Sequence, residues 1–304
     1  MIRRSLIVTP GNVAAKLMKA EAFPVDILML DIEDGVPDTA EAKVRARELL
    51  GAAVSVNRFR ARELAIRVNG PRSEWFLDDI SFVCGLDIPT IVVPMIEDAE
   101  DMVYVERTFD AMRAPEGLGL ILLIETPAGV LNLQDIVKAS PRTNGLIAGG
   151  LDYAMTTHSL SILPMAKSGA ASRLDDDLLF MRQKVLAVAR ACDLSAIDAM
   201  RPGELTDLST FRADAEYSRW LGFDGLDFYH PAYIDIANEV FTPSDEELDW
   251  ANKVLASNQG TNSAEAASRK VDGRVILPQH RAIARRLRDL ADEIVKGQAR
   301  EIQG

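Results

Sequence analysis

The chain has 304 residues, of which 48% are hydrophobic and 26% charged, and its formal net charge at pH 7 is −12. So acidic a chain does not attract nucleic-acid phosphates, and we expect no nucleic-acid partner. No apolar run approaches the ~20 residues of a membrane-spanning helix, and the run after Arg3 and Arg4 is too short for a signal peptide. We therefore expect a cytoplasmic protein without a membrane partner.

The first βα unit ends its strand in a Pro-Gly-Asn loop. An apolar run at 5–8 predicts a buried strand, and helical periodicity follows from residue 14. Between them, the backbone donors of Gly11 and Asn12, with Lys16 nearby, could face an anionic group. A plain turn followed by solvated lysines explains the same residues, so both interpretations stay open.

The second strand, predicted at 27–30, ends in the acids Asp31, Glu33 and Asp34. Acids crowded at one strand end cost energy unless a cation or hydrogen-bond donors offset them. We therefore predict part of a functional site here, with a solvated turn as the alternative. The following segment, 39–50, is expected to form an amphipathic helix with Lys43 on its outer, solvent-facing side.

The third strand, at 64–68, carries Arg67 inside its apolar run. A guanidinium is costly to bury without an anion, and its fork fits a substrate carboxylate or a developing enolate. An ion pair with the Asp31 cluster is the alternative, and the two interpretations are compatible. The next strand, at 90–93, ends at Pro94, which we include among the residues expected to line the substrate site.

Two further carboxylates end the strands predicted within the stretch 120–153. The first apolar run leads to Glu125, a helix follows, and the second run leads to Asp152. Both runs are continuous, as in parallel strands that are covered on both faces. Two carboxylates at one rim suggest Mg²⁺, which takes one or two of them and keeps water or substrate oxygens in its other positions. Each acid alone could instead cap a helix or turn.

The count of strands favours a (β/α)8 TIM barrel. Strands predicted at 196–200 and 226–229 complete eight, with one βα unit in roughly 30 residues. We assign residues 1–243 to this catalytic domain and residues 244–304 to a C-terminal helical extension. A polar loop before residue 173 is long enough to be functional. A polar, mobile linker is expected at about 257–272, and the last helix should cover an active site or pack on a neighbouring subunit.

The motifs resemble those of the citrate lyase β-subunit-like family, relatives of malyl-CoA and citramalyl-CoA lyases in the HpcH/HpaI aldolase superfamily. The resemblance covers nearly the whole chain. It rests on LIVTPGN, LDIEDGVPDTAEAKVRAR, IRVNG, LIETPAGVLN, GLDYA, GFDG and HPAYIDIANEVFTPSDEE.

This resemblance implies roles for individual residues. Glu125 and Asp152 would ligate Mg²⁺, Arg67 would meet the substrate, and Glu33 and Asp34 would lie around the metal's waters. Lys16, after the Pro-Gly-Asn loop, would lie toward the CoA end.

The chain also departs from the family pattern. Relatives carry an aspartate in a tail motif that acts across a subunit boundary, and Leu277 stands at that place. Met95 and Leu226 stand where relatives often have lysine.

The leading hypothesis is an Mg²⁺-dependent carbon–carbon lyase that cleaves or condenses a short β-hydroxyacyl-CoA to a 2-oxo acid and an acyl-CoA. One alternative is a CoA-independent, metal-dependent aldolase that acts on a hydroxy-keto acid. Another is a citrate-lyase-like subunit or binding protein without independent activity. We expect a homo-oligomer, a trimer or a hexamer.

Overall fold

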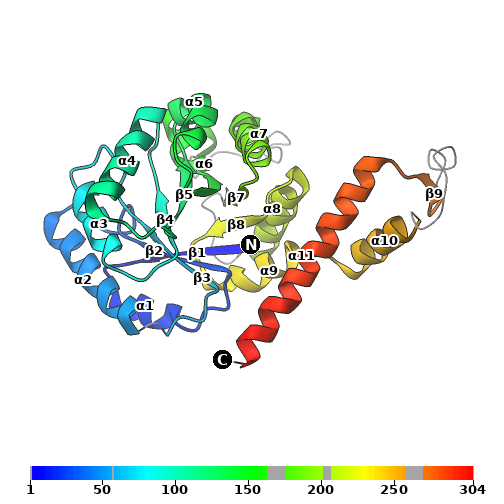
Figure 1. The fold of residues 1–304 in the computed structure, drawn as a ribbon, viewed down its shortest axis with the longest axis horizontal. Coiled ribbons are helices and arrows are strands. Elements are labelled where there is room, and N and C mark those ends of the chain that lie inside the picture. Colours follow the sequence, from blue (N-terminus) through cyan, green and yellow to red (C-terminus); the bar gives the residue numbers. More distant parts are fainter. Residues whose placement is uncertain (1, 57, 163–175, 201–206, 258–269, 304) are drawn as a thin grey trace. The chain divides into compact units, whose positions relative to one another are not determined.

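A computed structural model describes residues 2–56, 58–162, 176–200, 207–257 and 270–303, and Figure 1 shows their arrangement. Most of the predicted polar loop, from residue 163, and most of the predicted linker, 258–269, lie outside the described residues. Within the described ranges, every helix is too short or too polar to cross a membrane.

Eight parallel strands close into a barrel in the order of the sequence, with β1 paired to β8. This confirms the predicted (β/α)8 TIM barrel. The strands are β1 (Ser5–Pro10), β2 (Ile27–Asp31), β3 (Glu63–Arg67), β4 (Thr90–Val93), β5 (Gly119–Ile124), β6 (Thr143–Ala148), β7 (Ser195–Ala199) and β8 (Gly225–Phe228).

Helices follow the strands and surround them, as the ribbon in Figure 1 shows. They are α1 (Ala14–Ala20), α2 (Ala40–Val56), α3 (Phe76–Cys84), α4 (Ala99–Met112), α5 (Pro127–Lys138), α6 (Gly150–Thr156), α7 (Asp176–Ala191), α8 (Leu208–Leu221) and α9 (Ile234–Val240), with short 3-10 helices at Leu160–Ile162 and Pro231–Tyr233. Because the helices cover the outer face and side chains fill the inner one, the strands read as unbroken apolar runs.

The inside of the barrel is an apolar core with polar side chains at the amino ends of the strands. Its middle is filled by side chains from alternate strand positions, namely Leu6, Val8, Ile27, Met29, Ala65, Val92, Ile121, Leu123, Ile147, Ile197 and Ala199. At the amino ends of the strands, buried Arg3 makes two hydrogen bonds of 2.8–2.9 Å to Glu63 and one of 2.7 Å to Ser195. Because apolar side chains pack the inside of the barrel and a buried ion pair lies at this end, we look for the functional site at the opposite rim, at the carboxyl ends of the strands.

The orientation predicted for α2 is wrong at Lys43. This residue is buried together with Ala46, Leu50 and Val54, whereas Val44 is exposed. The buried positions are spaced three and four apart, which places Lys43 on the inner face of the helix. The lysine is buried because its ammonium group has several acceptors there, as the site geometry shows.

The chain divides into two compact units, one of residues 3–238 and the other of residues 1–2 and 239–304. In the latter unit, a capping box of Ser244 and Glu247 opens α10 (Asp245–Ala256). A two-stranded antiparallel ribbon, β9 (Lys270–Val271) and β10 (Arg274–Val275), leads to α11 (Pro278–Gln303). The two helices share a small core around Val254, Ile276 and Ala284. The predicted domain boundary at residue 243 stays a prediction.

Candidate active site

The predicted site residues come from strands whose carboxyl ends share one rim. Arg67 is the last residue of β3, and Asp31, paired with it in the sheet, is the last residue of β2. Glu125 follows β5 directly. Asp152 does not end a strand as predicted, because β6 stops at Ala148 and Asp152 lies in the first turn of α6.

Arg67 is buried and is paired mainly with Asp31. Its Nε and Nη2 atoms donate hydrogen bonds of 2.8 and 2.7 Å to the two carboxylate oxygens of Asp31, a bidentate pair. Nη1 lies 2.9 Å from Glu33 Oε2 and 3.9 Å from Asp34 Oδ2. Burial opposes the charge on Arg67, but Asp31, Glu33 and Asp34 outweigh it and raise the pKa of the guanidinium. An ion pair with Asp31 and a contact with the substrate therefore remain compatible interpretations of Arg67.

Glu33 and Asp34 differ in exposure, although they are neighbours. The Glu33 side chain is 13% exposed and that of Asp34 is 67% exposed. Glu33 Oε2 accepts no hydrogen bond from any described residue, since its contact with Arg67 is an ion pair without hydrogen-bond geometry. Burial raises the pKa of Glu33 to about 7, against the attraction of Arg67 and with the help of nearby acids. Glu33 can therefore hold or release a proton near neutral pH.

Glu125 is buried at the bottom of the rim and meets Asp152. Its Oε1 accepts a hydrogen bond of 3.0 Å from the backbone N–H of Met95. Burial, followed by Glu33 and Asp152, raises the pKa of Glu125 well above its usual value. Burial followed by Asp34 raises the pKa of Asp152. Because each acid acts on the pKa of the other, Glu125 and Asp152 lie within electrostatic reach of each other.

This pair fits a hard divalent cation. A cation between Glu125 and Asp152 would offset the negative charge that burial penalises. Two carboxylates suit an ion such as Mg²⁺, which binds through one or two carboxylates and fills its other positions with water or ligand oxygens.

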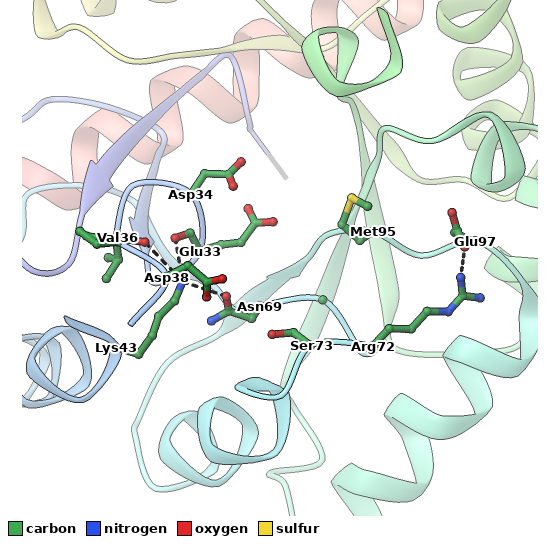
Figure 2. A pocket seen from close by; sticks show the side chains of 12 residues that line it. Glu33, Asp34, Val36, Asp38, Lys43, Asn69, Arg72, Ser73, Met95 and Glu97 are labelled. Carbon is green, nitrogen blue, oxygen red and sulfur yellow. Dashed lines mark hydrogen bonds and ion pairs between the residues drawn. The ribbon is translucent and has the colours of Figure 1, made fainter. Parts of the chain in front are cut away.

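The loop that carries Glu33 and Asp34 is fixed by Asp31 and Lys43. Asp31 accepts hydrogen bonds of 2.9 and 2.7 Å from the backbone N–H groups of Glu33 and Gly35. Lys43 Nζ donates to the carbonyls of Ile32 and Glu33 and to Asn69 Oδ1 at 2.8–2.9 Å, and Figure 2 shows it reaching this loop from below. Burial lowers the pKa of Lys43, whereas nearby acids oppose the shift.

A pocket of about 510 Å³ opens beside this loop. In Figure 2, Glu33 and Asp34 lie on one side of it, and Met95 and the Arg72–Glu97 ion pair lie on the other. The loops after β2, β3 and β4 therefore surround one space. It continues from the acidic cluster and is wide enough for a small acid or for part of a longer ligand.

The other residues predicted for substrate binding lie on loops of the same barrel unit. Gly11 donates its N–H to Asp31 O at 2.8 Å, and a Cβ atom at Gly11 would lie 2.8 Å from the same oxygen. The half-buried Asn12 Oδ1 accepts no hydrogen bond from a described residue. Lys16 is exposed on α1, and buried Pro94 follows β4. The structure contains no ligand, so their role in binding stays a prediction.

Two parts of this site were missed in the sequence. The inward direction of Lys43 could have been read from the sequence, because Lys43 shares helical spacing with the apolar residues Ala46 and Leu50. The Met95 N–H had none, because it is a backbone donor whose direction depends on an unusual left-handed conformation, with φ 56°.

Three comparisons with known proteins show what the chain is similar to. The family model HpcH/HpaI aldolase/citrate lyase matches residues 4–231. The chain is similar to a (3S)-malyl-CoA thioesterase of Cereibacter sphaeroides, with 31% identity over 96% of this chain and 95% of the relative. It is also similar to the citrate lyase subunit beta of Escherichia coli, with 28% identity over 90% of each chain.

A likeness to a solved structure supports the fold. The crystal structure of CitE from Mycobacterium tuberculosis in complex with magnesium, acetoacetate and coenzyme A superposes with a TM-score of 0.75 and 22% identity. The match covers 96% of this chain and 98% of that chain. At this identity, the likeness is one of fold.

Proposed function

Because the chain belongs to the HpcH/HpaI aldolase/citrate lyase family, whose members are lyase-type enzymes, we propose that it is an Mg²⁺-dependent carbon–carbon lyase. It cleaves a short β-hydroxyacyl-CoA to a 2-oxo acid and an acyl-CoA, or in the reverse direction condenses these two compounds. The observation that carries this proposal is the placement of two acids, buried Glu125 directly after β5 and Asp152 in the first turn of α6, at a rim that also holds buried Arg67.

Glu125 and Asp152 are the residues that would hold the ion. Related CitE of M. tuberculosis was solved with magnesium, which supports the same ion here. When bound, Mg²⁺ supplies a Lewis acid and a template for the oxygen atoms of an oxo or hydroxy acid. The Met95 N–H keeps the Glu125 carboxylate in one orientation.

Arg67 supplies the positive charge for the organic substrate. Two of its nitrogens are held by Asp31, so the guanidinium cannot turn away, and Nη1 faces the Glu33 side. Such a preorganised cation stabilises negative charge that develops on the thioester oxygen as the carbon–carbon bond breaks. Glu33 is placed to take or return a proton, because its carboxyl oxygen Oε2 is free of hydrogen bonds from described residues and its pKa lies near 7.

The proposal for CoA rests on the relatives and on the loop after β1. A (3S)-malyl-CoA thioesterase is similar over almost the whole chain, and the exposed Lys16 on α1 offers a cationic group to a long ligand. Leu277, which stands where relatives have a tail aspartate, is 49% exposed in the C-terminal unit. It cannot exchange protons, so any acid or base must come from another residue.

Product analysis tests the reaction. The protein with Mg²⁺ is incubated with malyl-CoA and with citramalyl-CoA, and released 2-oxo acid and free thiol are measured separately. A lyase releases the oxo acid without free thiol. Free thiol without an oxo acid would show thioester hydrolysis instead, as the name of the similar thioesterase suggests. Turnover of a free hydroxy-keto acid alone would favour the CoA-independent aldolase, and no turnover at all would favour a subunit without independent activity.

The metal site is tested without relying on turnover. We predict that Mg²⁺ raises the Tm of the wild type by several degrees, since a ligand at 100 times its Kd stabilises by about 2.7 kcal/mol. Glu125→Gln and Asp152→Asn should each lose this shift while remaining folded, because the metal loses an anionic ligand.

Glu106→Gln is the matched control, since Glu106 on α4 faces Arg142 at 3.5 Å and is no part of the site. It should keep the full Mg²⁺ shift. A wild type whose melting is indifferent to Mg²⁺, or a Glu125→Gln variant with an unchanged shift, would refute the proposed ion site.

A further inference from the structure

Strand β8 contributes a buried acid that the proposed mechanism does not use. Asp227 is paired in the sheet with Leu6 of β1 and with Ala199 of β7, and both of these residues belong to the core inside the barrel. The next residue, Phe228, packs edge-on against Phe211 of α8 on the outer side. Since successive side chains of a strand point to opposite faces, Asp227 points into the barrel.

Asp227 lacks the partners that a buried carboxylate normally has. It is 5% exposed, and its Oδ1 atom accepts no hydrogen bond from any residue in the described part of the chain. Burial raises the pKa of Asp227 to about 7; the Arg67 guanidinium opposes the shift and the Asp31 carboxylate adds to it. Asp227 thus lies within electrostatic reach of the Arg67–Asp31 pair that forms one side of the active site.

A neighbouring strand provides the contrast. Asp198 of β7 is also buried, but it faces the helices. Its Oδ1 accepts hydrogen bonds of 3.1 Å from Arg182 and from the Ala199 N–H, and its Oδ2 accepts one of 2.6 Å from Ser218. Every polar atom of this side chain is satisfied, as expected of an acid kept for structure. Asp227 is also buried, but its Oδ1 atom accepts no hydrogen bond from a described residue, which costs folding free energy.

An acid that is buried at a cost, aimed into the barrel and close to the substrate arginine indicates a functional role. We propose that Asp227 is a substrate-binding residue of the same site, whose free carboxyl oxygen forms a hydrogen bond with an oxygen of the bound hydroxy or oxo acid. This inference rests on the proposed function. It names a polar contact on the β8 side of the rim, in addition to the proposed metal ligands Glu125 after β5 and Asp152 in α6 and to Arg67 on β3.

The proposed role of Asp227 follows from the polar group that it places on β8 near a bound short acid. Asp227 is a hydrogen-bonding group among apolar core side chains such as its strand neighbours Leu6 and Ala199, so a substrate oxygen that approaches from the Arg67 side would meet a polar group there and not a hydrocarbon side chain. In a site built to hydrogen-bond a substrate oxygen, loss of the partner weakens binding strongly, because the remaining polar group is left buried and unpaired. Asp227 thus favours a ligand with a polar oxygen at this depth over a plain hydrocarbon chain.

Paired substitutions at Asp227 and Asp198 test the inference in the full chain. Freshly dissolved oxaloacetate is the probe, and its binding in the presence of Mg²⁺ is measured by calorimetry, with Tm measured in the absence of both ligands. We expect Asp227→Ala to weaken oxaloacetate binding at least tenfold, and Asp227→Asn, which keeps shape and hydrogen-bonding groups, to stay within about threefold of wild type. Without ligands, Asp227→Asn should melt at or above the wild-type temperature, because a buried charge is removed.

The control variants Asp198→Asn and Asp198→Ala should behave in the opposite way, with a lower Tm and unchanged oxaloacetate affinity below the melting transition. The inference would be overturned, while the proposed function stands, if Asp227→Ala binds oxaloacetate like wild type or fails to fold. An Asp227→Asn variant that melts at as low a temperature as Asp198→Asn would overturn it as well. A wild type without Mg²⁺-dependent oxaloacetate binding would overturn both.

Discussion

At the scale of single residues, Arg67 and Asp31 combine structure and function in one pair. Arg67→Lys keeps the charge but cannot form the fork that contacts both oxygens of Asp31. One buried carboxylate oxygen then lacks a donor, so we expect a loss of about 1–3 kcal/mol in the free energy of unfolding. The cation also loses its fixed direction, and kcat/KM should fall by a factor of about 100 or more. Urea unfolding and steady-state kinetics measure the two effects.

Arg72→Lys is the matched control for Arg67→Lys. Arg72 lines the pocket beside the acidic loop and contacts Asp98 and Asp101 at 3.0–3.1 Å, but its side chain is 53% exposed. Exposed ion pairs stabilise by less than about 1 kcal/mol, so this change should be mild. Equal losses for both variants would contradict the special role given to Arg67.

Met95 holds a left-handed backbone conformation that a side chain disfavours. Its φ is 56°, and its N–H donates to Glu125. We predict that Met95→Gly has a free energy of unfolding about 1 kcal/mol above that of Met95→Ala, because only glycine adopts this conformation without cost. At exposed Val103 in α4, the same two replacements should differ in the opposite sense, since alanine favours helices. Thermal or urea unfolding of the four variants decides the point.

At the scale of elements, the contact between the ends of β5 and β6 positions the metal pair. Gly149 follows β6 and donates its N–H to Ile124 O at 2.9 Å. A Cβ atom at Gly149 would lie 2.6 Å from the Glu125 Cβ, too close without a shift of the backbone. We predict that Gly149→Ala lowers Tm and abolishes the Mg²⁺-dependent rise in Tm, because Glu125 is displaced.

Gly117→Ala provides the control for this steric argument. Nothing lies within 4 Å of a Cβ atom at Gly117, which precedes β5. The variant should keep the Mg²⁺ effect and should be as stable as wild type or slightly more so, since alanine restricts the unfolded chain. If Gly149→Ala binds Mg²⁺ like Gly117→Ala, the close approach of the two loops is not needed for the ion.

The barrel itself could be predicted because its elements obey one simple rule. Continuous apolar runs ended by polar residues mark parallel strands, and the carboxyl ends of such strands meet at one rim. Applied to the sequence, this rule is enough to put Arg67, Glu33 and Glu125 at the same end of the fold. It could not place Asp152 correctly, because the strand ends at Ala148 and a short helix begins in the same run of sequence.

The remaining features depend on contacts between distant segments. Lys43 faces inward because the carbonyls of the β2–α2 loop and Asn69 Oδ1 accept its protons, and no local pattern reveals acceptors so far away. Asp227 was missed for a related reason. Within an apolar strand, an acid reads as an interruption, and only the register with β1 and β7 shows that it points into the barrel.

At the scale of the whole molecule, the acidic rim makes folding depend on pH. Glu33 and Asp227 both have a pKa near 7, raised from 4.5 and 3.8 mainly by burial. Between roughly pH 4.5 and 7, the folded chain keeps protons on these groups that the unfolded chain has lost. The free energy of unfolding therefore decreases as pH rises through this window. Asp207 affects the free energy of unfolding in a different pH range. Its hydrogen bonds lower its pKa to about 2, so its contribution to stability is lost only in acid.

We predict that Asp227→Asn changes this pH dependence in a defined direction. The variant has no charge to bury, so its Tm relative to wild type should rise as pH goes from about 5.5 to about 8, in EDTA to exclude divalent ions. A paired Asp198→Asn series provides the reference for a buried acid that is fully hydrogen-bonded. A difference between Asp227→Asn and wild type that stays constant across this range would mean that Asp227 does not titrate there. Mg²⁺ should oppose the loss of stability in the wild type, because its charge favours the ionised rim that burial alone disfavours.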